Sequence, residues 1–593
     1  MEQEKVSLEW PEYVVFAFTL SISAIIGIYY GFFGTKQKST TEYLLANREM
    51  SAWPVSMSLV CSAVSAITIL GNPVETYLYG TPTMWIIFTY IPFTLSLAFL
   101  YLPVYFRLKV NSAYEYIELR FNSTVRTTVS LIAIVQLIVS MAIAVYAPSL
   151  AINQVTGIST RISTAVIYLV CVFYSTLGGL KAVLWTDVFQ AFVMLASVLV
   201  TLIIGLGDVG GLSEAWKLAG DAGRLEFFNF DVDPRTRHTF WTEIIGGYFF
   251  LLPTYAATQI QIQRFLSMPT LAEARKSLVL NAIGLTVIVG LTFFTGLVVF
   301  ARYSNCDPIT AKYVSKSDQL LPFFVVDSVR DIPGLIGLFV AGITCASMST
   351  LSSGLSALTS IATYDYINKF YPKLSDAKLS FISKVNCLLF GMISYLFIFV
   401  VENMGDILPA TSAILGIFLG PILGLFSLGM FFPSANAKGS LFGMILAIAL
   451  MLTFVIGNQV ASGQGLLPDQ RLPLRTDECM DTSNGTSTTQ ATSNFPWDWE
   501  GTDWKNKDDR LLVKFLSTSY LWYTCMGCVL SVFLGLLISM LLRILSEGEK
   551  ALKVKRDHLS PPVVWLWQRT FPQLLDSWLD SSSDLTLDKM ESE

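Results

Sequence analysis

Hydroxyl-bearing side chains interrupt several segments of this sequence that are otherwise apolar enough to cross a membrane. The segment 60–73 (VCSAVSAITILGNP) carries Ser62, Ser65 and Thr68 at intervals of three, which places them along one face of a helix. Gly71-Asn72-Pro73 is then predicted to end that helix, because proline has no N–H to donate. In lipid a broken helix is tolerated only where it lines a cavity, so this pattern indicates an ion or substrate path.

Two further interruptions are predicted by the same signal. The segment 253–263 (PTYAATQIQIQ) puts a proline, hydroxyls and amides into an apolar context, and 344–360 (TCASMSTLSSGLSALTS) concentrates serine and threonine. The adjacent hydroxyls of Ser349 and Thr350 suit a hard cation, which prefers oxygen ligands. The alternative for any single hydroxyl is a bond to a carbonyl four residues back, or close helix packing. Together the three clusters favour a polar path.

Three carboxylates lie within or beside the apolar segments, where charged groups are rare and usually functional. Asp187 lies in LWTDVFQ and is expected to face an ion pathway; the alternative is a helix N-terminal carboxylate favoured by the dipole. Glu75 and Glu243 are expected to meet water in an outer vestibule.

Metal and hydrolase chemistry is disfavoured by the residues available for it. The chain has eight cysteines and two histidines, and none of them form a cluster with metal-ligand spacing. No nucleophile and base are placed together either, so we do not expect an enzyme.

The elements that position these residues are predicted to be membrane-spanning helices. The chain has 593 residues, of which 53% are hydrophobic and only 14% charged. A spanning helix needs about 20 apolar residues, and about thirteen such segments are present. We place them at 13–33, 53–71, 84–106, 128–151, 162–177, 185–206, 240–259, 279–302, 334–360, 382–402, 407–431, 439–457 and 514–542.

The distribution of lysine and arginine predicts the orientation. Basic residues follow spans one, three, five, seven, nine and thirteen, all on one side, and that side is expected to be cytoplasmic. The N-terminus is then extracellular and the tail 543–593 cytoplasmic and mostly disordered, with Trp565 and Trp567 as a short interfacial patch. The plasma membrane is the expected location.

Three long loops, 207–239, 303–333 and 458–513, are predicted to lie outside. Asn484 begins a glycosylation sequon in the last of them. Cys306 and Cys479 are both predicted to be extracellular, where disulfides persist, and we expect them to pair; the alternative is two free thiols.

Long motifs of the chain resemble the sodium/solute symporter family, in its iodide, multivitamin and monocarboxylate branch. They are SAYEYIELRF (112–121), APSLAINQVTG (147–157), FYSTLGGLKAVLWTDVFQ (173–190), RHTFWT (237–242), CDPITAKYVSKSDQLLP (306–322) and PGLIGLFVAG (333–342). The resemblance extends from about residue 13 to 542 and is greatest to the sodium-coupled monocarboxylate transporters.

The resemblance implies an all-α polytopic protein with the LeuT-type fold of two inverted five-helix repeats. Residues 1–33 would hold the N-terminal end and first span, 53–206 the first repeat and 240–431 the second. Residues 439–542 would hold two C-terminal spans with the glycosylated loop 458–513 between them. The first helix of each repeat, at 53–71 and 240–259, would be the broken one.

The resemblance also implies site residues. Sodium would be bound by the carbonyls of Cys61, Val64 and Ala346 and the hydroxyls of Ser349 and Thr350, with Asp187 nearby on the exit path. The substrate cavity would be lined by Ser65, Thr68, Tyr146, Tyr255 and Gln259. The position of Thr68 is glutamine in the iodide carrier, histidine in the sugar carriers and threonine in the monocarboxylate carriers, which favours a monocarboxylate.

The expected function is therefore sodium-coupled uptake of a small organic anion across the lipid bilayer by alternating access, with co-transported sodium and no nucleic acid. A multivitamin carrier for biotin or pantothenate is an alternative within the class. A substrate-gated sensor with little coupled uptake, and a proton-coupled carrier using Asp187 or Glu243, are alternatives of other kinds.

Overall fold

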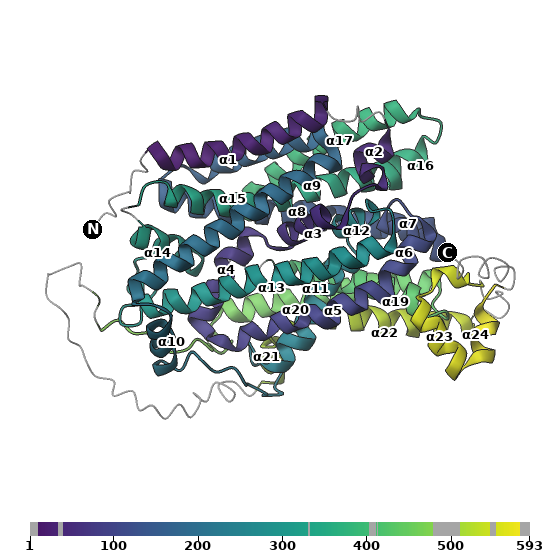
Figure 1. The fold of residues 1–593 in the computed structure, drawn as a ribbon. Helices are drawn as coiled ribbons and strands as arrows, with labels where there is room; N and C mark the ends of the chain where they lie inside the picture. Colours follow the sequence, from purple (N-terminus) through teal and green to yellow (C-terminus); the bar gives the residue numbers. More distant parts are fainter. Residues whose placement is uncertain are drawn as a thin grey trace.

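The computed structural model describes residues 10–33, 39–329, 332–402, 411, 413–477, 479, 510–545 and 553–580, and these are helical apart from loops and one isolated bridge between Val554 and Leu579. The helices run along one long axis, and the first helix (Trp10–Ile28, purple) begins at the opposite end of the bundle from the last two (561–578, yellow) (Figure 1).

The first half of the chain contains the following helices: α1 Trp10–Ile28, η1 Tyr29–Phe33, α2 Thr40–Leu45, η2 Ala46–Arg48, α3 Ala52–Ala63, α4 Ala66–Tyr79, η3 Thr81–Thr89, α5 Tyr90–Ser96, η4 Leu97–Tyr101, α6 Leu102–Leu108, α7 Ala113–Arg120, α8 Ser123–Thr156, α9 Thr160–Val209 and α10 Leu212–Asp221.

The second half contains η5 Thr242–Gly246, α11 Gly247–Ala256, α12 Gln259–Leu266, α13 Leu271–Arg302, η6 Ser317–Gln319, α14 Leu320–Val329, α15 Leu335–Ile361, η7 Ala362–Ile367, α16 Asn368–Phe370, α17 Asp376–Val401, η8 Leu415–Leu419, α19 Gly420–Phe431, α20 Ala437–Gly463, α21 Leu511–Leu516, α22 Trp522–Leu545, η10 Arg556–His558, α23 Pro561–Thr570 and α24 Pro572–Trp578.

Nine helices in the described part of the chain are long and apolar enough to cross a membrane, or ten if the bent pair α3–α4 is one span. This number is lower than the predicted thirteen for identifiable reasons. The 50-residue α9 covers two predicted spans, which meet at the non-helical Gly179. The helices between residues 242 and 266, and those at 415–431, are each too short to be counted.

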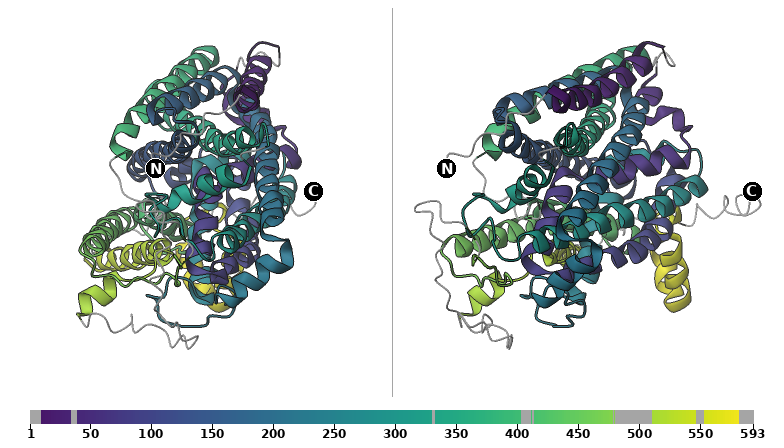
Figure 2. Two further views of the ribbon diagram at one scale, coloured as in Figure 1. Left: turned by 90° about the vertical axis from the view of Figure 1, so that its left-hand side faces the viewer. Right: turned by 60° about the vertical axis from the view of Figure 1, so that its left-hand side comes forward.

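The apolar core is centred on α15, which is almost wholly buried. This helix contacts α1, α3, α8, α9 and α17, and α1, purple in Figures 1 and 2, lies along an outer edge of the bundle. Large apolar side chains instead cover the outside of α1, α17, α20 and α22. That distribution is the one expected of a bundle whose outer surface meets lipid.

The first predicted interruption is present, but its predicted position is wrong. Helix α3 ends at Ala63 and α4 begins at Ala66, with Val64 and Ser65 extended and the two helices bent by 58°. Gly71-Asn72-Pro73 lies inside α4, which continues to Tyr79. Neighbouring helix α13 supports this segment: Asn72 donates to Thr292 at 3.0 Å, and Gly296 packs directly on the Pro73 carbonyl. Proline is tolerated in spanning helices when neighbours compensate in this way.

The second interruption is confirmed, and the third is wrong. Ala257 and Thr258 leave helical geometry between α11 and α12. By contrast α15 runs unbroken from Leu335 to Ile361. Several of its hydroxyls bond carbonyls of the same helix, as Thr359 does with Leu355 at 2.7 Å. The serine-rich composition therefore permits close packing around a continuous helix.

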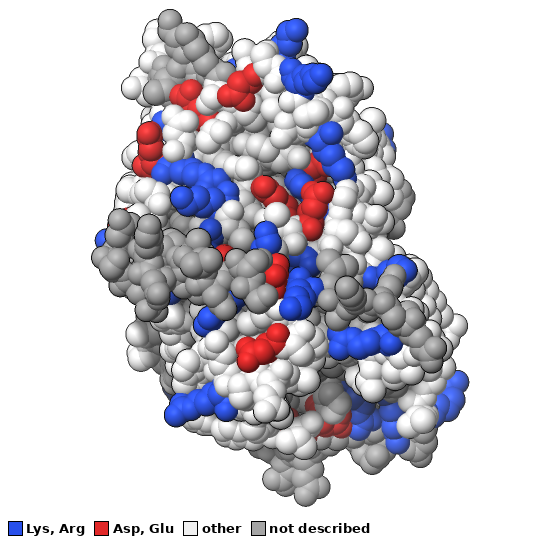
Figure 3. Space-filling view, turned by 90° about the vertical axis from the view of Figure 1, so that its right-hand side faces the viewer, with Lys and Arg blue, Asp and Glu red and all other residues white. Residues whose placement is uncertain are grey.

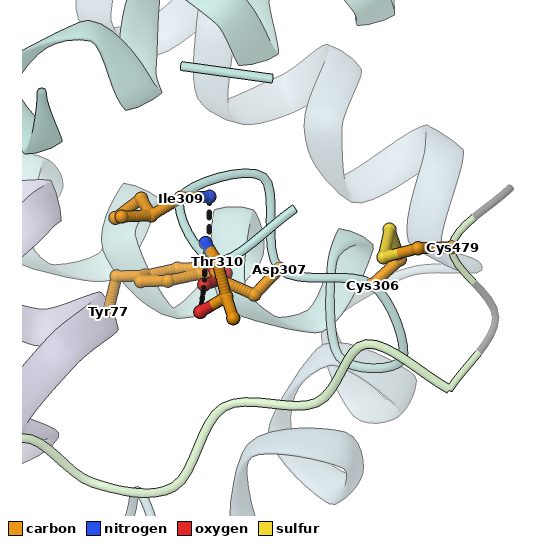
Figure 4. The surroundings of a disulfide bond; sticks show 6 residues. All are labelled: Tyr77, Cys306, Asp307, Ile309, Thr310 and Cys479. Carbon is orange, nitrogen blue, oxygen red and sulfur yellow. Dashed lines mark hydrogen bonds between the residues drawn. A yellow bond between two sulfur atoms is a disulfide. The ribbon is translucent and has the colours of Figure 1, made fainter. Parts of the chain in front are cut away.

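Cys306 and Cys479, the two cysteines predicted to pair, form a disulfide in the structure (Figure 4). The turn that follows Cys306 is held by Asp307, which accepts hydrogen bonds from Tyr77 at 2.6 Å and from the Thr310 backbone at 2.8 Å. The bond thus ties the segment after α20 to the turn after α13. Asn484 lies outside the described residues.

The prediction of a mostly disordered tail is wrong for residues 553–580. Val554, Leu559, Val564 and Leu575 form a small apolar core of their own, and α23 and α24 fold around it. In Figure 1 these two helices lie at the same end of the bundle as α6 and α7.

Candidate ion and substrate site

The break between α3 and α4 provides backbone oxygens in the middle of the bundle. Val64 caps α3, and its N–H bonds the Val60 carbonyl at 2.9 Å. The final carbonyls of a helix have no partner within it. The carbonyls of Cys61 and Val64 are at this end and are buried, so they can serve as ligands for a cation.

Helix α15 brings the predicted hydroxyls to the same region, since it packs against α3. Ser349 is fully buried and its hydroxyl has no well-formed hydrogen bond, although it lies beside the Cys61 thiol and the Asp187 carboxylate. Thr350 donates to the carbonyl of Ala346 at 3.1 Å. The structure therefore places Cys61, Ser349 and Asp187 together, and the unpartnered Ser349 hydroxyl is chemically suited to a sodium ion.

Asp187 is buried in a network that the sequence reasoning missed. Its Oδ2 accepts a hydrogen bond from Ser58 at 2.5 Å and pairs with Arg264 of α12 at 3.0 Å. Both charged side chains are buried, at 0% and 1% exposure. The helix-dipole alternative for Asp187 is wrong, because this residue lies two turns beyond the Gly179 kink, and the dipole effect is confined to the first turn.

Arg264 joins the second broken helix to three other elements. It donates to Ser58 of α3 at 2.7 Å, to Ser353 of α15 and to Asp187 of α9 at 3.0 Å, and also to the Ile260 carbonyl of its own helix at 2.8 Å. Arg264 follows predicted span seven, 240–259, and is therefore one of the basic residues from which the orientation is predicted. Its position within two turns of an amide-rich helix break is a signal that it has polar partners.

The predicted substrate residues fall into two groups. Ser65 and Thr68, at and just after the α4 break, are half-buried, and Tyr146 lies on α8, which contacts α4. Tyr255 and Gln259 are wholly buried and already engaged. The Tyr255 hydroxyl donates to Asn281 at 3.3 Å. The Gln259 amide accepts from the Ala113 N–H at 2.7 Å and donates to Ser360 at 2.9 Å.

A cavity of about 740 Å³ opens at the end of the bundle that carries the loops after α10 and α20. Its wall includes Gly71, Val74 and Glu75 of α4, so it begins one turn along that helix from Thr68. Glu75 meets this cavity as predicted. Glu243 does not, because it is 1% exposed and lies behind His238.

His238 links the two broken segments at the end of the bundle where the cavity opens. Its ring nitrogens lie 2.6 Å from the Glu243 carboxylate before α11 and 2.8 Å from that of Glu75 on α4. Burial lowers the pKa of His238, but hydrogen bonds to Glu243 and then Glu75 outweigh this, so its pKa is raised. Arg237 holds the other side of Glu75 at 2.6 Å and lies between the rings of Tyr79 and Tyr520.

Known proteins of related sequence are sodium-coupled transporters. The chain is 40% identical over 532 residues to sodium-coupled monocarboxylate transporter 1 of Homo sapiens, with 89% of this chain and 87% of that protein covered. It is 39% identical to sodium-coupled monocarboxylate transporter 2 of Mus musculus, over 89% and 83%. It is 38% identical to the "Putative sodium-dependent multivitamin transporter" of Drosophila melanogaster, over 95% and 93%.

The fold agrees with this relationship. A solved sodium-coupled sialic acid symporter matches with a TM-score of 0.70 at 22% identity, covering 90% of this chain and 98% of that one. The chain has the LeuT-type fold that the motifs imply. Residues 43–447 match the model of the sodium:solute symporter family. The chain is therefore a multi-pass membrane transporter, not an enzyme, and belongs to the sodium:solute symporter family.

Proposed function

We propose that this sodium-coupled symporter carries small monocarboxylates inward across the plasma membrane. The observation that supports the ion site best is the buried Ser349 hydroxyl, which has no well-formed hydrogen bond and lies beside Cys61 and Asp187. A polar group buried without a partner costs free energy, and a sodium ion would remove that cost. Thr350 would contribute an oxygen lone pair while its O–H donates to the Ala346 carbonyl.

Sodium binding would couple to substrate through the broken helix. Cys61 and Val64 lie immediately before the break, and Ser65 and Thr68 lie at and after it. An ion held by the carbonyls would therefore order the same turn that presents hydroxyls to the substrate. A bound ion shifts the equilibrium between conformations only by its difference in affinity for them. We propose that sodium favours the state in which the 740 Å³ cavity is open.

The opposite end of the site is closed by the Asp187–Arg264 pair with Ser58 and Ser353. Inward release would require α12 to move relative to α9, which separates these groups. We place the cavity end outside and the end with α23 and α24 in the cytoplasm. The end face in Figure 3, at the proposed cytoplasmic end, carries many lysine and arginine side chains, as the charge rule expects.

The ion site is tested by sodium titration of substrate uptake in proteoliposomes. Ser349→Ala and Thr350→Val should each raise the sodium concentration for half-maximal uptake about tenfold or more, the size of one lost contact to a charged group. Thr359→Val is a matched control, because its hydroxyl lies on the same helix and donates one turn back, to the carbonyl of Leu355. Unchanged sodium dependence in both test variants would refute the site, and uptake without sodium would refute the coupling.

A multivitamin carrier is the second candidate, favoured by the relative from Drosophila melanogaster that matches 95% of this chain. A labelled panel of lactate, butyrate, nicotinate, biotin, pantothenate and iodide, with and without sodium, separates the two. Sodium-dependent uptake of lactate or butyrate supports the monocarboxylate proposal. Uptake of biotin and pantothenate alone overturns it, and substrate-evoked current without accumulation indicates a sensor.

A further inference from the structure

The folded tail is fixed to the ends of the spanning helices. The Ser560 N–H donates to the Met430 carbonyl at 3.0 Å, and the Trp567 indole donates to the Phe431 carbonyl at 3.1 Å. These are terminal carbonyls of α19, which would otherwise have no partner in the helix. Tyr116 of α7 donates to the His558 carbonyl at 3.1 Å. The tail therefore completes the end of α19 rather than extending away from it.

The two tail helices have an inner and an outer face. The inner face holds Val564 and Leu575, both buried, and Trp567 packs edge-on against Trp578 with ring centroids 5.5 Å apart. The outer face carries four large apolar side chains in solvent contact: Trp565 at 56% exposure, Leu566 at 53%, Phe571 at 57% and Leu574 at 45%. An exposed apolar group of this kind on a protein surface usually marks a binding face.

The depth of α23 along the bundle indicates what this face meets. Helix α23 contacts η4, Leu97–Tyr101, within the span Thr81–Leu108. Tyr101 is seven residues before the end of that span, which corresponds to about 10 Å at 1.5 Å per residue. The tail helix thus lies beside the last turns of a membrane-spanning segment. Helices that lie in the bilayer interface bury their apolar face about 5–10 Å into the boundary between headgroups and acyl chains.

Two arginine side chains lie beside η4 and α23. Arg275 donates to the Ala98 carbonyl at 3.2 Å, and its guanidinium lies 4.9 Å from the ring of Phe99, which is itself exposed on η4. Arg569 lies over the exposed ring of Trp565 at 5.0 Å. Arginine and tryptophan in this combination are typical of the membrane interface, where the ring meets acyl chains and the guanidinium meets phosphate.

We propose that α23 and α24 form an interfacial cap whose outer face, Trp565, Leu566, Phe571 and Leu574, inserts into the lipid leaflet at this end of the bundle. The occupant is lipid because α23 packs on η4, and the same short segment carries the exposed Phe99 with Arg275 beside it. The cap holds the end of α19 at a constant height relative to the membrane surface.

The test uses spin labels on the full chain in lipid nanodiscs, with Cys525, a free cysteine that is only half-buried, replaced by serine. Labels at Leu566→Cys and Leu574→Cys should be relaxed severalfold more by oxygen, which concentrates in lipid, than by a water-soluble nickel complex. A label at Asp576→Cys, exposed on the same helix as Leu574, is the matched control and should show the reverse. Adding Leu566→Glu should increase the relaxation of the Leu574→Cys label by the nickel complex relative to that by oxygen.

Each other outcome overturns the proposal. Equal access of the nickel complex to Leu566→Cys, Leu574→Cys and the control means that the face is in water. Protection of both test labels from oxygen and nickel alike means that protein covers the face, either a second copy or a partner. These substitutions are at exposed positions, so the folded cap should persist.

Discussion

Arg264 and Asp187 form a buried ion pair whose disruption should be among the most destabilising changes in the protein. Arg264 donates to four acceptors, and Asp187 also accepts from Ser58, while its Oδ1 has no well-formed hydrogen bond. Replacing Arg264 by methionine keeps much of the side-chain volume but leaves a buried carboxylate with a single hydrogen bond. Replacing Asp187 by asparagine leaves a buried guanidinium without its counter-charge.

The expected cost follows from this burial. Removing one partner of a buried pair costs about 3–5 kcal/mol, because the remaining charge stays out of water without compensation. That corresponds to a change of between about 10² and 10⁴ in the unfolding equilibrium constant. The double variant Arg264→Met/Asp187→Asn leaves no unpaired charge. It should be more stable than the sum of the single variants predicts, by about 2–3 kcal/mol.

The measurement is equilibrium unfolding of the full chain in mixed detergent micelles, followed by tryptophan fluorescence as the denaturing detergent increases. The exposed pair Arg302–Asp327 provides a matched control, since its atoms are 3.3 Å apart but the side chains are 42% and 39% exposed. Pairs of that kind contribute about 0–1 kcal/mol, so Arg302→Met should have little effect.

Two results would refute the reasoning. If Arg264→Met costs no more than Arg302→Met, the charge on Asp187 is not buried as the structure describes. If the double variant loses as much as the two single variants combined, the two side chains do not act as a pair.

Three further predictions concern other parts of the structure. Because the pKa of His238 is raised, its charged form stabilises the fold fully below about pH 6.5, and this stability is lost as the pH rises through the raised pKa. The free energy of unfolding of His238→Gln, measured from pH 6 to 9, should lack that loss. The same pH dependence in His238→Gln and the unaltered chain would contradict the argument. Cys306→Ser opens a loop of 173 residues and should lower the free energy of unfolding by up to about 5 kcal/mol. Reducing the disulfide of the unaltered chain should lower it by the same amount, and reducing agent should have no effect on the variant. Gly179→Ala should lower expression and melting temperature, because φ at this residue is +57° and an added Cβ would lie 2.7 Å from Tyr43. Gly207→Ala is the control, because a Cβ there meets open space, and equal effects of the two substitutions would contradict the argument.

Residue types and their order along the chain were sufficient to predict an all-helical membrane protein, its family and two helix breaks. Apolar segments of spanning length can be recognised locally because each must satisfy its backbone internally. The long motifs identified the family, and the proline with amides at 253–263 correctly indicated the second break. The Cys306–Cys479 bond was also predicted, because both residues follow spans on the same side.

Only the tertiary structure decided where polar groups meet. Pro73 continues a helix because α13 supports it, and the serine-rich α15 is unbroken because its hydroxyls bond its own carbonyls. Arg264 belongs to a buried network because Ser58, Asp187 and Ser353 arrive from three other helices. The tail is ordered because α19 ends with carbonyls that Ser560 and Trp567 can reach. Each of these outcomes depends on a partner distant in sequence, and no local pattern contains that partner.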